Sequence, residues 1–219
     1  IIYIGQENGV HSGAIRTKNG ILISASDAST NNKLARFTAN SQGNRLKRVQ
    51  ISENIYDPQT RPWYIAAKAA KKPVWTQIYT DFLTRDLAIT AAMPIYDDSG
   101  NLLGVTASDL LFSRIKEFLA GIKIGKTGQT FLMERSGVLI ATSTASEELA
   151  VQGKEVKRIK ASESDNPVIR ETSKYLEKSY GNLAKINNSQ QITFEVQGKR
   201  KFIQVAPFQD DRGLDWLIV

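Results

Sequence analysis

The segment Tyr56–Ala67, YDPQTRPWYIAA, crowds aromatic rings and a guanidinium into a few positions of a chain that is 8% aromatic. Arg61 carries a planar fork of donors that matches a carboxylate, and the indole N–H of Trp63 can reach the same anion if both face one cavity. Tyr56 and Tyr64 flank this pair, and aromatic side chains supply both the apolar walls and the orienting hydroxyls of small-molecule pockets. The segment is a candidate site for a ligand that carries a carboxylate.

Residues further along the chain could hold the cationic end of such a ligand. In the strand-like segment WTQIYTD, Tyr79 and Asp81 are two positions apart and therefore lie on one face of a strand. Asp109 stands where the strand GVTAS gives way to a predicted helix. Asp81 and Asp109 are candidate counter-charges for an ammonium group.

The same spacing also has an ordinary explanation. Trp63 and Tyr64 could be core residues of an amphipathic helix, and Arg61 could form a surface ion pair. Asp109 could serve only as a helix N-cap. Local spacing does not choose between a binding site and this alternative.

The sequence offers little for catalysis or metal binding. It has no cysteine and one histidine, His11, in a Gly-rich stretch that we predict to be an exposed turn. Disulfides, thiolate metal sites and histidine pairs are therefore excluded, and a Ser-His-Asp triad has no second candidate base. We predict no enzymatic activity, no metal and no cofactor, and a hydrolase built on carboxylates alone is the remaining enzymatic alternative.

Two further patterns have ordinary explanations. The segment AGIKIGKTG resembles a phosphate-binding loop, but Ala120 occupies the position of the required first glycine, so a turn before the strand FLMER is expected. Adjacent carboxylates fall in predicted hairpin turns, where aspartate is favoured for backbone reasons. These pairs are Asp97 with Asp98 and Asp210 with Asp211.

The chain carries 29 Lys and Arg against 22 Asp and Glu, a net charge of +7. Such an excess suits nucleic acid, anionic lipid or an ordinary solvated surface. The basic residues come in short scattered groups without zinc-finger spacing or an aromatic RNA-binding strand, which favours the solvated surface over nucleic acid. The groups are Arg45, Lys47, Arg48; Lys68, Lys71, Lys72; Lys154, Lys157, Arg158, Lys160; and Lys199, Arg200, Lys201.

Short strands with turn signals dominate the first half, and helices are predicted over 61–70 and 109–119. The turn 97–101, DDSGN, should join the strands AITAAMPIY and LLGVTAS as a hairpin. The predicted strands are 1–4, 14–16, 21–25, 74–79, 87–96 and 102–108.

The second half repeats this scheme more loosely. QTFLMERSGVLIATS reads as strand, turn and strand, and the polar segment 145–191 contains one predicted helix, 167–179. The strands QITFEVQ, KRKFIQVAPF and DWLIV close the chain. We predict an α+β fold with two lobes, 1–120 and 121–219, each a central antiparallel sheet flanked by helices. The strand-like apolar ends suggest a domain of a longer protein whose membrane anchors lie outside the chain.

Several of these motifs, in their order, resemble a known family. Tyr56, then RPWY at 61–64, then WTQIYTD, then AMPIYDDSGNLLGVTASDL are similar to the membrane-distal lobe of double Cache sensory domains. GKTGQTFLMERSGVLIATS is similar to the opening hairpin of their membrane-proximal lobe. The likeness covers roughly residues 1 to 145 well and the closing strands more loosely. Such domains are the extracytoplasmic ligand-binding parts of bacterial chemoreceptors, sensor histidine kinases and cyclic-nucleotide-signalling receptors, and their two lobes are PAS-like.

The resemblance implies a function for the candidate residues. In the subset of the family that recognises free amino acids, Arg61 and Trp63 would hold the α-carboxylate of the ligand, and Tyr64 would pack against it or bond to it. The residues implied around the α-ammonium are Tyr56, Tyr79, Asp81 and Asp109. The long helix that precedes the first strand in the family has no counterpart before Ile1.

On this basis we expect residues 1–120 to be the membrane-distal, ligand-binding lobe and residues 121–219 to be the membrane-proximal lobe. The expected partner is a free amino acid, the expected location is extracytoplasmic, and a homodimer is compatible with the family. The alternatives are an amine or purine sensor on the same scaffold, which would not need Arg61, and a structural or interaction domain without a ligand.

Overall fold

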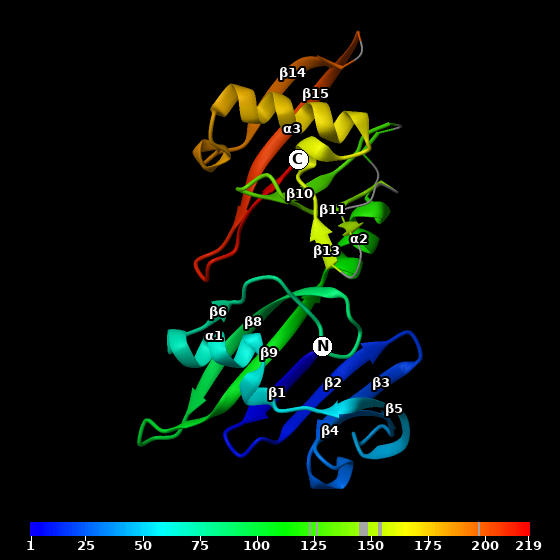
Figure 1. Cartoon of the computed structure of the whole chain (residues 1–219), viewed down its shortest axis with the longest axis vertical. Helices are drawn as coiled ribbons and strands as arrows, with labels where there is room; N and C mark the ends of the chain where they lie inside the picture. Colours follow the sequence, from blue (N-terminus) through cyan, green and yellow to red (C-terminus); the bar gives the residue numbers. More distant parts are fainter. Residues whose placement is uncertain (123, 126, 145–148, 153–154, 197) are drawn as a thin grey trace. The chain divides into compact units, whose positions relative to one another are not determined.

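The computed structural model describes residues 1–122, 124–125, 127–144, 149–152, 155–196 and 198–219. Internal contacts divide the chain into two compact units, Ile1–Leu111 and Phe112–Val219, and each unit has its own antiparallel sheet (Figure 1). The α+β class with two sheet-based lobes is therefore confirmed. The division precedes helix α2 (Phe112–Gly121), which packs against β11 (Leu139–Thr142) and belongs to the second unit, whereas the sequence-based boundary at residue 120 assigned it to the first.

One sheet forms the first unit, in the strand order β5-β4-β3-β2-β1-β9-β8-β6, with β7 paired to β8. Its strands are β1 (Ile2–Gln6), β2 (His11–Thr17), β3 (Gly20–Ser26), β4 (Lys33–Ala39), β5 (Arg45–Ile55), β6 (Val74–Trp75), β7 (Tyr79–Thr80), β8 (Leu87–Tyr96) and β9 (Leu102–Leu111). Its helical segments are η1 (Ala28–Thr30), η2 (Pro58–Thr60) and α1 (Pro62–Ala70).

The hairpin between β8 and β9 is confirmed. Asp97 Oδ1 accepts hydrogen bonds from the backbone N–H groups of Ser99 (2.9 Å) and Asn101 (2.8 Å), and Gly100 adopts φ 82°. Strand β9 then continues to Leu111, paired with β8. Asp109 consequently lies inside a strand and is not the N-cap of a helix, so the start of the helix predicted at 109 is wrong.

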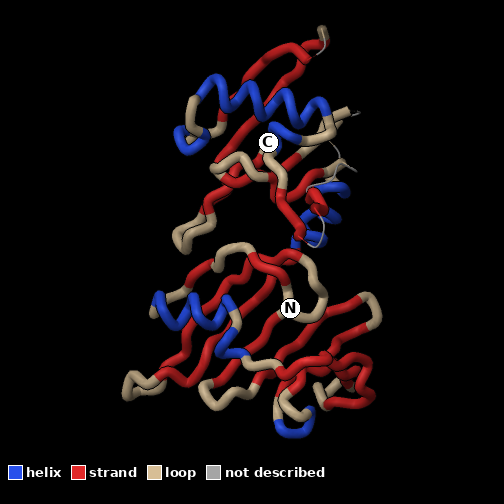
Figure 2. Tube along the Cα trace, viewed as in Figure 1, coloured by secondary structure: helices blue, strands red, loops and turns tan. Residues whose placement is uncertain are grey.

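Helix α1 covers part of this sheet. Figure 2 shows it lying across the strands, and it packs on β8 and β9. Trp63, Tyr64 and Ala67 form its buried face. Gly5 on β1 makes the approach of this segment feasible, because a Cβ there would lie 2.6 Å from Pro58 Cβ and 2.7 Å from the Trp63 ring. The predicted helix over 61–70 is confirmed, and its aromatic residues do belong to the core.

The second unit contains a five-stranded sheet in the order β11-β10-β16-β15-β14 and a separate pair, β12 with β13. Its strands are β10 (Phe131–Glu134), β11 (Leu139–Thr142), β12 (Leu149–Gln152), β13 (Glu155–Arg158), β14 (Gln190–Val196), β15 (Lys199–Gln209) and β16 (Asp215–Ile218). Its helical segments are α2 (Phe112–Gly121), η3 (Ala161–Glu163), α3 (Pro167–Tyr180) and η4 (Leu183–Lys185). Ile169 and Leu176 of α3 are buried against Met133, Val205 and Leu217 of the sheet.

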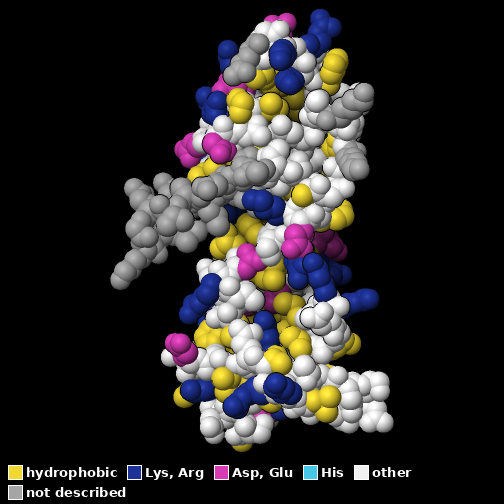
Figure 3. Space-filling view, turned by 90° about the vertical axis from the view of Figure 1, so that its right-hand side faces the viewer, with side chains coloured by type: hydrophobic (Ala, Val, Ile, Leu, Met, Phe, Trp, Pro, Cys, Tyr) yellow, Lys and Arg dark blue, Asp and Glu magenta, His cyan; other side chains and the backbone are white. Residues whose placement is uncertain are grey.

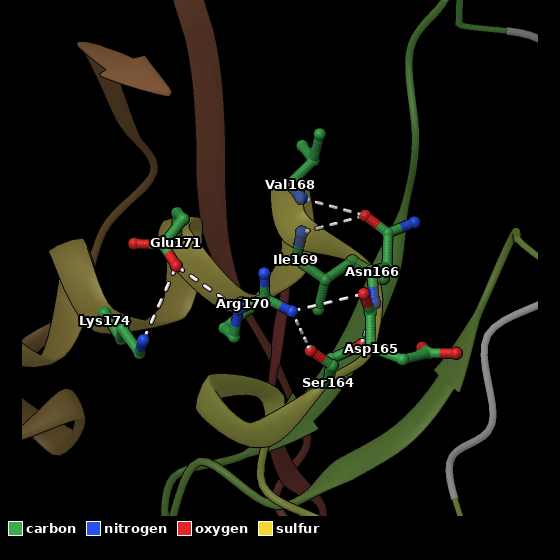
Figure 4. A network of polar contacts seen from close by, with 8 residues as sticks. All are labelled: Ser164, Asp165, Asn166, Val168, Ile169, Arg170, Glu171 and Lys174. Atoms are coloured by element: carbon green, nitrogen blue, oxygen red, sulfur yellow. Dashed lines mark hydrogen bonds and ion pairs between the residues drawn. The ribbon is translucent and has the colours of Figure 1, made fainter. Parts of the chain in front are cut away.

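Helix α3 begins with a well-defined cap (Figure 4). Asn166 Oδ1 accepts hydrogen bonds from the backbone N–H groups of Val168 (2.9 Å) and Ile169 (3.3 Å), which would otherwise lack partners. Arg170 Nη1 donates to the carbonyl of Ser164 at 2.7 Å and ties the preceding turn to the helix. The predicted helix over 167–179 is confirmed by these local contacts.

Part of the predicted polar segment that starts at 145, and part of AGIKIGKTG, lie outside the described residues. On the face drawn in Figure 3, Lys and Arg side chains stand in separate groups among acidic and uncharged ones, as expected of a solvated surface. In the described part of the chain, no helix combines the length and the apolar character that a membrane crossing requires.

Candidate ligand-binding site

A cavity in the first unit gathers most of the sequence-predicted site residues. Its volume is about 40 Å³. The wall combines Ile1 and side chains of β1 to β4, β7, β9 and α1 with the segments that precede α1 and follow β7. It is formed by Ile1, Tyr3, His11, Ile15, Ser24, Leu34, Arg36, Tyr56, Arg61, Trp63, Tyr79, Asp81, Phe82, Leu83 and Asp109.

Local structure places Arg61 at the cavity. Asp57 caps η2 by accepting a hydrogen bond from the N–H of Gln59 (2.9 Å), and Pro62 starts α1 directly after Arg61. Arg61 therefore sits between two helical segments with extended backbone, φ −85° and ψ 146°. Its side chain is not part of the surface of α1.

The Arg61 guanidinium lies over two adjoining aromatic rings, 5.0 Å from the centre of Phe82 and 5.9 Å from the centre of Tyr56. Such cation–π contacts position a cation without using its N–H donors. Across the residues that the structure describes, Arg61 forms no ion pair with a carboxylate. This end of the cavity thus carries the positive charge of Arg61, and the N–H donors of its guanidinium remain available to an anion.

Trp63 and Tyr56 complete this end. Trp63 is 2% exposed, and its ring packs edge-on against Tyr3 at 4.9 Å. Burial raises the pKa of Tyr56, while the positive charge of Arg61 acts in the opposite direction. The Tyr56 hydroxyl is therefore neutral at physiological pH and acts as a hydrogen-bonding group.

Asp109 provides the opposite charge in the same cavity. Tyr3 and Thr90 both donate to Asp109 Oδ1, the bond from Thr90 being 2.7 Å long. Tyr79 in turn is hydrogen bonded to Thr90 at 2.7 Å. Burial raises the pKa of Asp109, which the two donated bonds partly offset. The arrangement is a fixed, partly buried carboxylate within a hydrogen-bonded row of hydroxyls.

Asp81 adds a second carboxylate. Its Oδ1 accepts hydrogen bonds from the N–H of Leu83 (3.2 Å) and from the N–H and hydroxyl of Thr84 (2.7 and 2.6 Å), which fixes the loop after β7. Its negative charge contributes to the raised pKa of Asp109, so the two carboxylates act on each other. The cavity wall therefore carries two carboxylates in addition to the guanidinium of Arg61.

One predicted site residue lies elsewhere. Tyr64 is fully buried and does not line the cavity, and its hydroxyl donates to Glu7 Oε1 at 2.6 Å. The same oxygen accepts from Lys68 Nζ at 2.8 Å. The hydroxyl of Tyr64 is thus engaged with Glu7, and the ligand contact implied for Tyr64 has no counterpart in the cavity wall.

The structure adds wall residues that sequence reasoning missed. His11 lies in β2, 4% exposed, with its ring 5.2 Å from that of Tyr56, so the exposed turn predicted for it is wrong. Burial lowers its pKa to about 4. Arg36 and Ser24 face the cavity from β4 and β3. In the sequence, Ser24 and Ser26 alternate with Ala25, and this alternation indicates a polar face on β3. Arg36 could not be found in this way, because its strand β4 was not predicted from the sequence.

Comparison with known proteins identifies relatives of the chain. The family model described as Cache domain matches residues 11–219. The methyl-accepting chemotaxis protein McpC of Bacillus subtilis is 39% identical over 87 residues, which is 39% of this chain and 13% of McpC. The methyl-accepting chemotaxis protein PctB of Pseudomonas aeruginosa is 25% identical over 164 residues, 74% of this chain and 22% of PctB. The chain spans less than a quarter of the length of either relative.

The chain is also similar to solved structures, two of which are ligand-binding domains of chemoreceptors. The ligand-binding domain of PctB from Pseudomonas aeruginosa in complex with L-Arg is 21% identical, with a TM-score of 0.49, over 99% of this chain and 68% of that one. The ligand-binding domain of chemoreceptor CtaA from Pseudomonas fluorescens in complex with L-leucine is 16% identical, with a TM-score of 0.47, over 99% of this chain and 67% of that one.

Proposed function

Since the chain belongs to the Cache domain family, we propose that it is the extracytoplasmic sensor domain of a transmembrane signalling receptor and binds a free amino acid. The observation that carries the proposal is that the wall of one cavity contains Arg61 together with Asp109 and Asp81. An α-amino acid presents a carboxylate and an ammonium on one carbon, and this pair of charges matches that wall.

Each end of the ligand has defined partners in this proposal. The α-carboxylate accepts from the fork of Arg61 and from the indole N–H of Trp63. The α-ammonium donates to Asp109 and Asp81, with the hydroxyl of Tyr79 beside them. The hydroxyl of Tyr56 orients the ligand next to Arg61. The sensor catalyses no reaction and needs no cofactor.

The family assignment extends the proposal to the receptor as a whole. The chain corresponds to the extracytoplasmic part, and membrane anchors and output domains belong to other segments of the receptor, which can be a homodimer. Binding drives signalling only to the extent that the ligand has different affinities for two receptor conformations. Curated relatives such as McpC and PctB are chemotaxis proteins, which supports an output of that kind.

Calorimetry of the 219-residue chain with a panel of free L-amino acids tests the proposal. We expect at least one amino acid to bind, and to raise the melting temperature when present far above its dissociation constant. If no amino acid binds, or if the Arg61→Ala protein retains the affinity of the wild type, the proposal is wrong.

The methyl ester and the decarboxylated amine of the bound amino acid separate an amino-acid sensor from an amine sensor. An amine sensor would use Asp81, Asp109 and the aromatic wall without Arg61, so it would bind both analogues. An amino-acid sensor should lose most of its affinity for both, because each lacks the charge that Arg61 recognises.

A further inference from the structure

Arg36 is a second arginine of the cavity wall. The proposed recognition of the α-carboxylate and the α-ammonium does not involve it. It lies on β4 directly opposite Ser24 of β3, which in turn is opposite Gly13 of β2, and Gly13 is opposite Tyr3 of β1. Residues opposite each other on neighbouring strands share a face of the sheet. Arg36 therefore lies in the same cross-strand row as Tyr3, which donates a hydrogen bond to Asp109.

The guanidinium of Arg36 is only partly satisfied. Its Nη1 donates to Gln50 Oε1 at 3.2 Å, while Nε is buried without a partner. No ion pair joins Arg36 to a carboxylate in the described parts of the chain. Burial lowers the pKa of Arg36, and the negative charges of Asp81 and Asp109 oppose this shift. The buried Nε–H of this half-buried side chain is costly unless an acceptor completes it.

His11 and Ser24 make the neighbouring wall polar as well. His11 Nε2 is 3.2 Å from Ser24 Oγ, and its Nδ1 is buried without a partner. Burial keeps the imidazole neutral above pH 5, since it lowers the His11 pKa to about 4. This part of the wall thus carries one positive charge, from Arg36, and the polar atoms of Ser24 and His11 on the neighbouring strands β3 and β2.

Hydrogen bonding shows what the ligand must add. The cavity wall holds two arginines and two aspartates. When an amino acid binds, its carboxylate compensates Arg61 and its ammonium compensates one aspartate, so the other aspartate still balances the charge of Arg36. The buried Nε–H of Arg36 has no acceptor among the described residues, and the ligand's own side chain can supply one.

We propose that Arg36, with Ser24 and His11, forms the side-chain subsite of this sensor, and that it selects amino acids whose side chain ends in an acceptor oxygen, as a carboxylate or a carboxamide. The inference rests on the amino-acid function proposed above. Cationic side chains are excluded from the subsite by the charge of Arg36, and apolar side chains leave its donors without partners.

Calorimetry with side chains of similar length tests the subsite: L-glutamate, L-glutamine, L-leucine and L-lysine. The wild type should bind glutamate or glutamine at least about tenfold more tightly than leucine, with lysine weakest. Arg36→Met should lower the affinity for glutamate and glutamine about tenfold to a hundredfold and change that for leucine by less than about threefold. The matched control is Arg16→Met, an exposed arginine on β2 outside the cavity, which should leave all four affinities unchanged.

A wild type that prefers leucine or lysine overturns the subsite, and so does an Arg36→Met protein that loses affinity for all ligands equally. If Arg36→Met does not fold, Arg36→Lys replaces it, since Lys keeps the charge but not the fork. A selective loss of affinity for glutamine then supports the subsite, and unchanged affinities overturn it.

Failure of the subsite can be told apart from failure of the amino-acid function. If amino acids bind in an Arg61-dependent way while Arg36→Met leaves their ranking intact, only the subsite is wrong. If no amino acid binds the wild type, both are wrong.

Discussion

The phenol of Tyr3 donates a hydrogen bond to the carboxylate of Asp109, which lies 106 positions away on the adjacent strand β9. Thr90 donates to the same oxygen from the strand on the other side. Within the described residues, both hydrogen bonds of Asp109 end on Oδ1, so Oδ2 is the atom left for a ligand donor. Three strands of the sheet thus cooperate to orient one charge in the cavity.

Asp109 should make ligand binding sensitive to acid. Because burial raises its pKa, the carboxylate gains a proton at a higher pH than an ordinary aspartate does. An ammonium ligand needs the charged form, so affinity should be constant near neutrality and fall up to about tenfold per pH unit below that pKa. Asp109→Asn should bind about tenfold to a hundredfold more weakly at pH 7 and lose this dependence.

Calorimetry from pH 8 downwards checks this, with circular dichroism at each pH as the control for folding. If Asp109→Asn binds the amino acid at neutral pH as tightly as the wild type does, the ammonium is bound by other residues. The same conclusion follows if the affinity of the folded wild-type protein does not fall as the pH is lowered.

Arg61→Ala and Arg61→Lys separate the charge of the arginine from its geometry. Alanine should lower the affinity for the amino acid by about 1.5–3 kcal/mol, the contribution of a charge-assisted hydrogen bond. Lysine should recover only part of this loss, because it keeps the charge but lacks the planar fork that stacks on Phe82. Calorimetry with Arg48→Ala, an exposed residue of β5 outside the cavity, is the control. Full recovery by lysine would mean that charge alone suffices.

The features that sequence predicted well are local ones. The hairpin at 97–101 follows from Asp97 and Gly100, which satisfy the turn by themselves. Helix α1 follows from Pro62 and from the spacing of Trp63 and Ala67. Such elements can be predicted without knowing which strands or helices lie beside them. For the same reason, Arg61 could be identified as a candidate site residue from its own segment.

The features that sequence missed depend on neighbouring strands. Strand β5 is largely exposed and polar, so it lacks the apolar alternation that marks a half-buried strand, and β4 was missed with it. His11 is buried because β1 and β3 flank it, although its Gly-rich surroundings indicate a turn. Arg36 becomes a wall residue only once the order β4-β3-β2-β1 is known.

Tyr64→Phe tests whether this tyrosine serves the fold or the ligand. Its hydroxyl donates to Glu7, and the ring lies outside the cavity wall. Removal of the hydroxyl should lower the free energy of unfolding by about 0.5–1.5 kcal/mol and change ligand affinity by less than about twofold. Lys68→Met, which removes the exposed partner of Glu7, should cost less than about 1 kcal/mol. If Tyr64→Phe loses affinity for the ligand while its stability is unchanged, the Tyr64 hydroxyl contacts the ligand.

His11 should make the fold less stable in mild acid. Burial lowers its pKa to about 4 from the ordinary value of 6.5, so the unfolded chain binds a proton in this range more readily than the folded one. The stability that comes from the neutral imidazole is complete above pH 6.5 and is lost as the pH falls toward 4. Between pH 7 and pH 5 the expected loss of stability is about 2 kcal/mol.

Urea denaturation of the wild type and of His11→Gln at pH 7 and at pH 5 measures this loss. The carboxylates, Asp109 included, titrate in both proteins, so the difference between the two losses isolates His11. The His11→Gln protein should be less stable than the wild type at pH 7, and its free energy of unfolding should fall by about 2 kcal/mol less on acidification. Equal losses in the two proteins would mean that His11 becomes protonated in the folded protein as readily as in the unfolded chain.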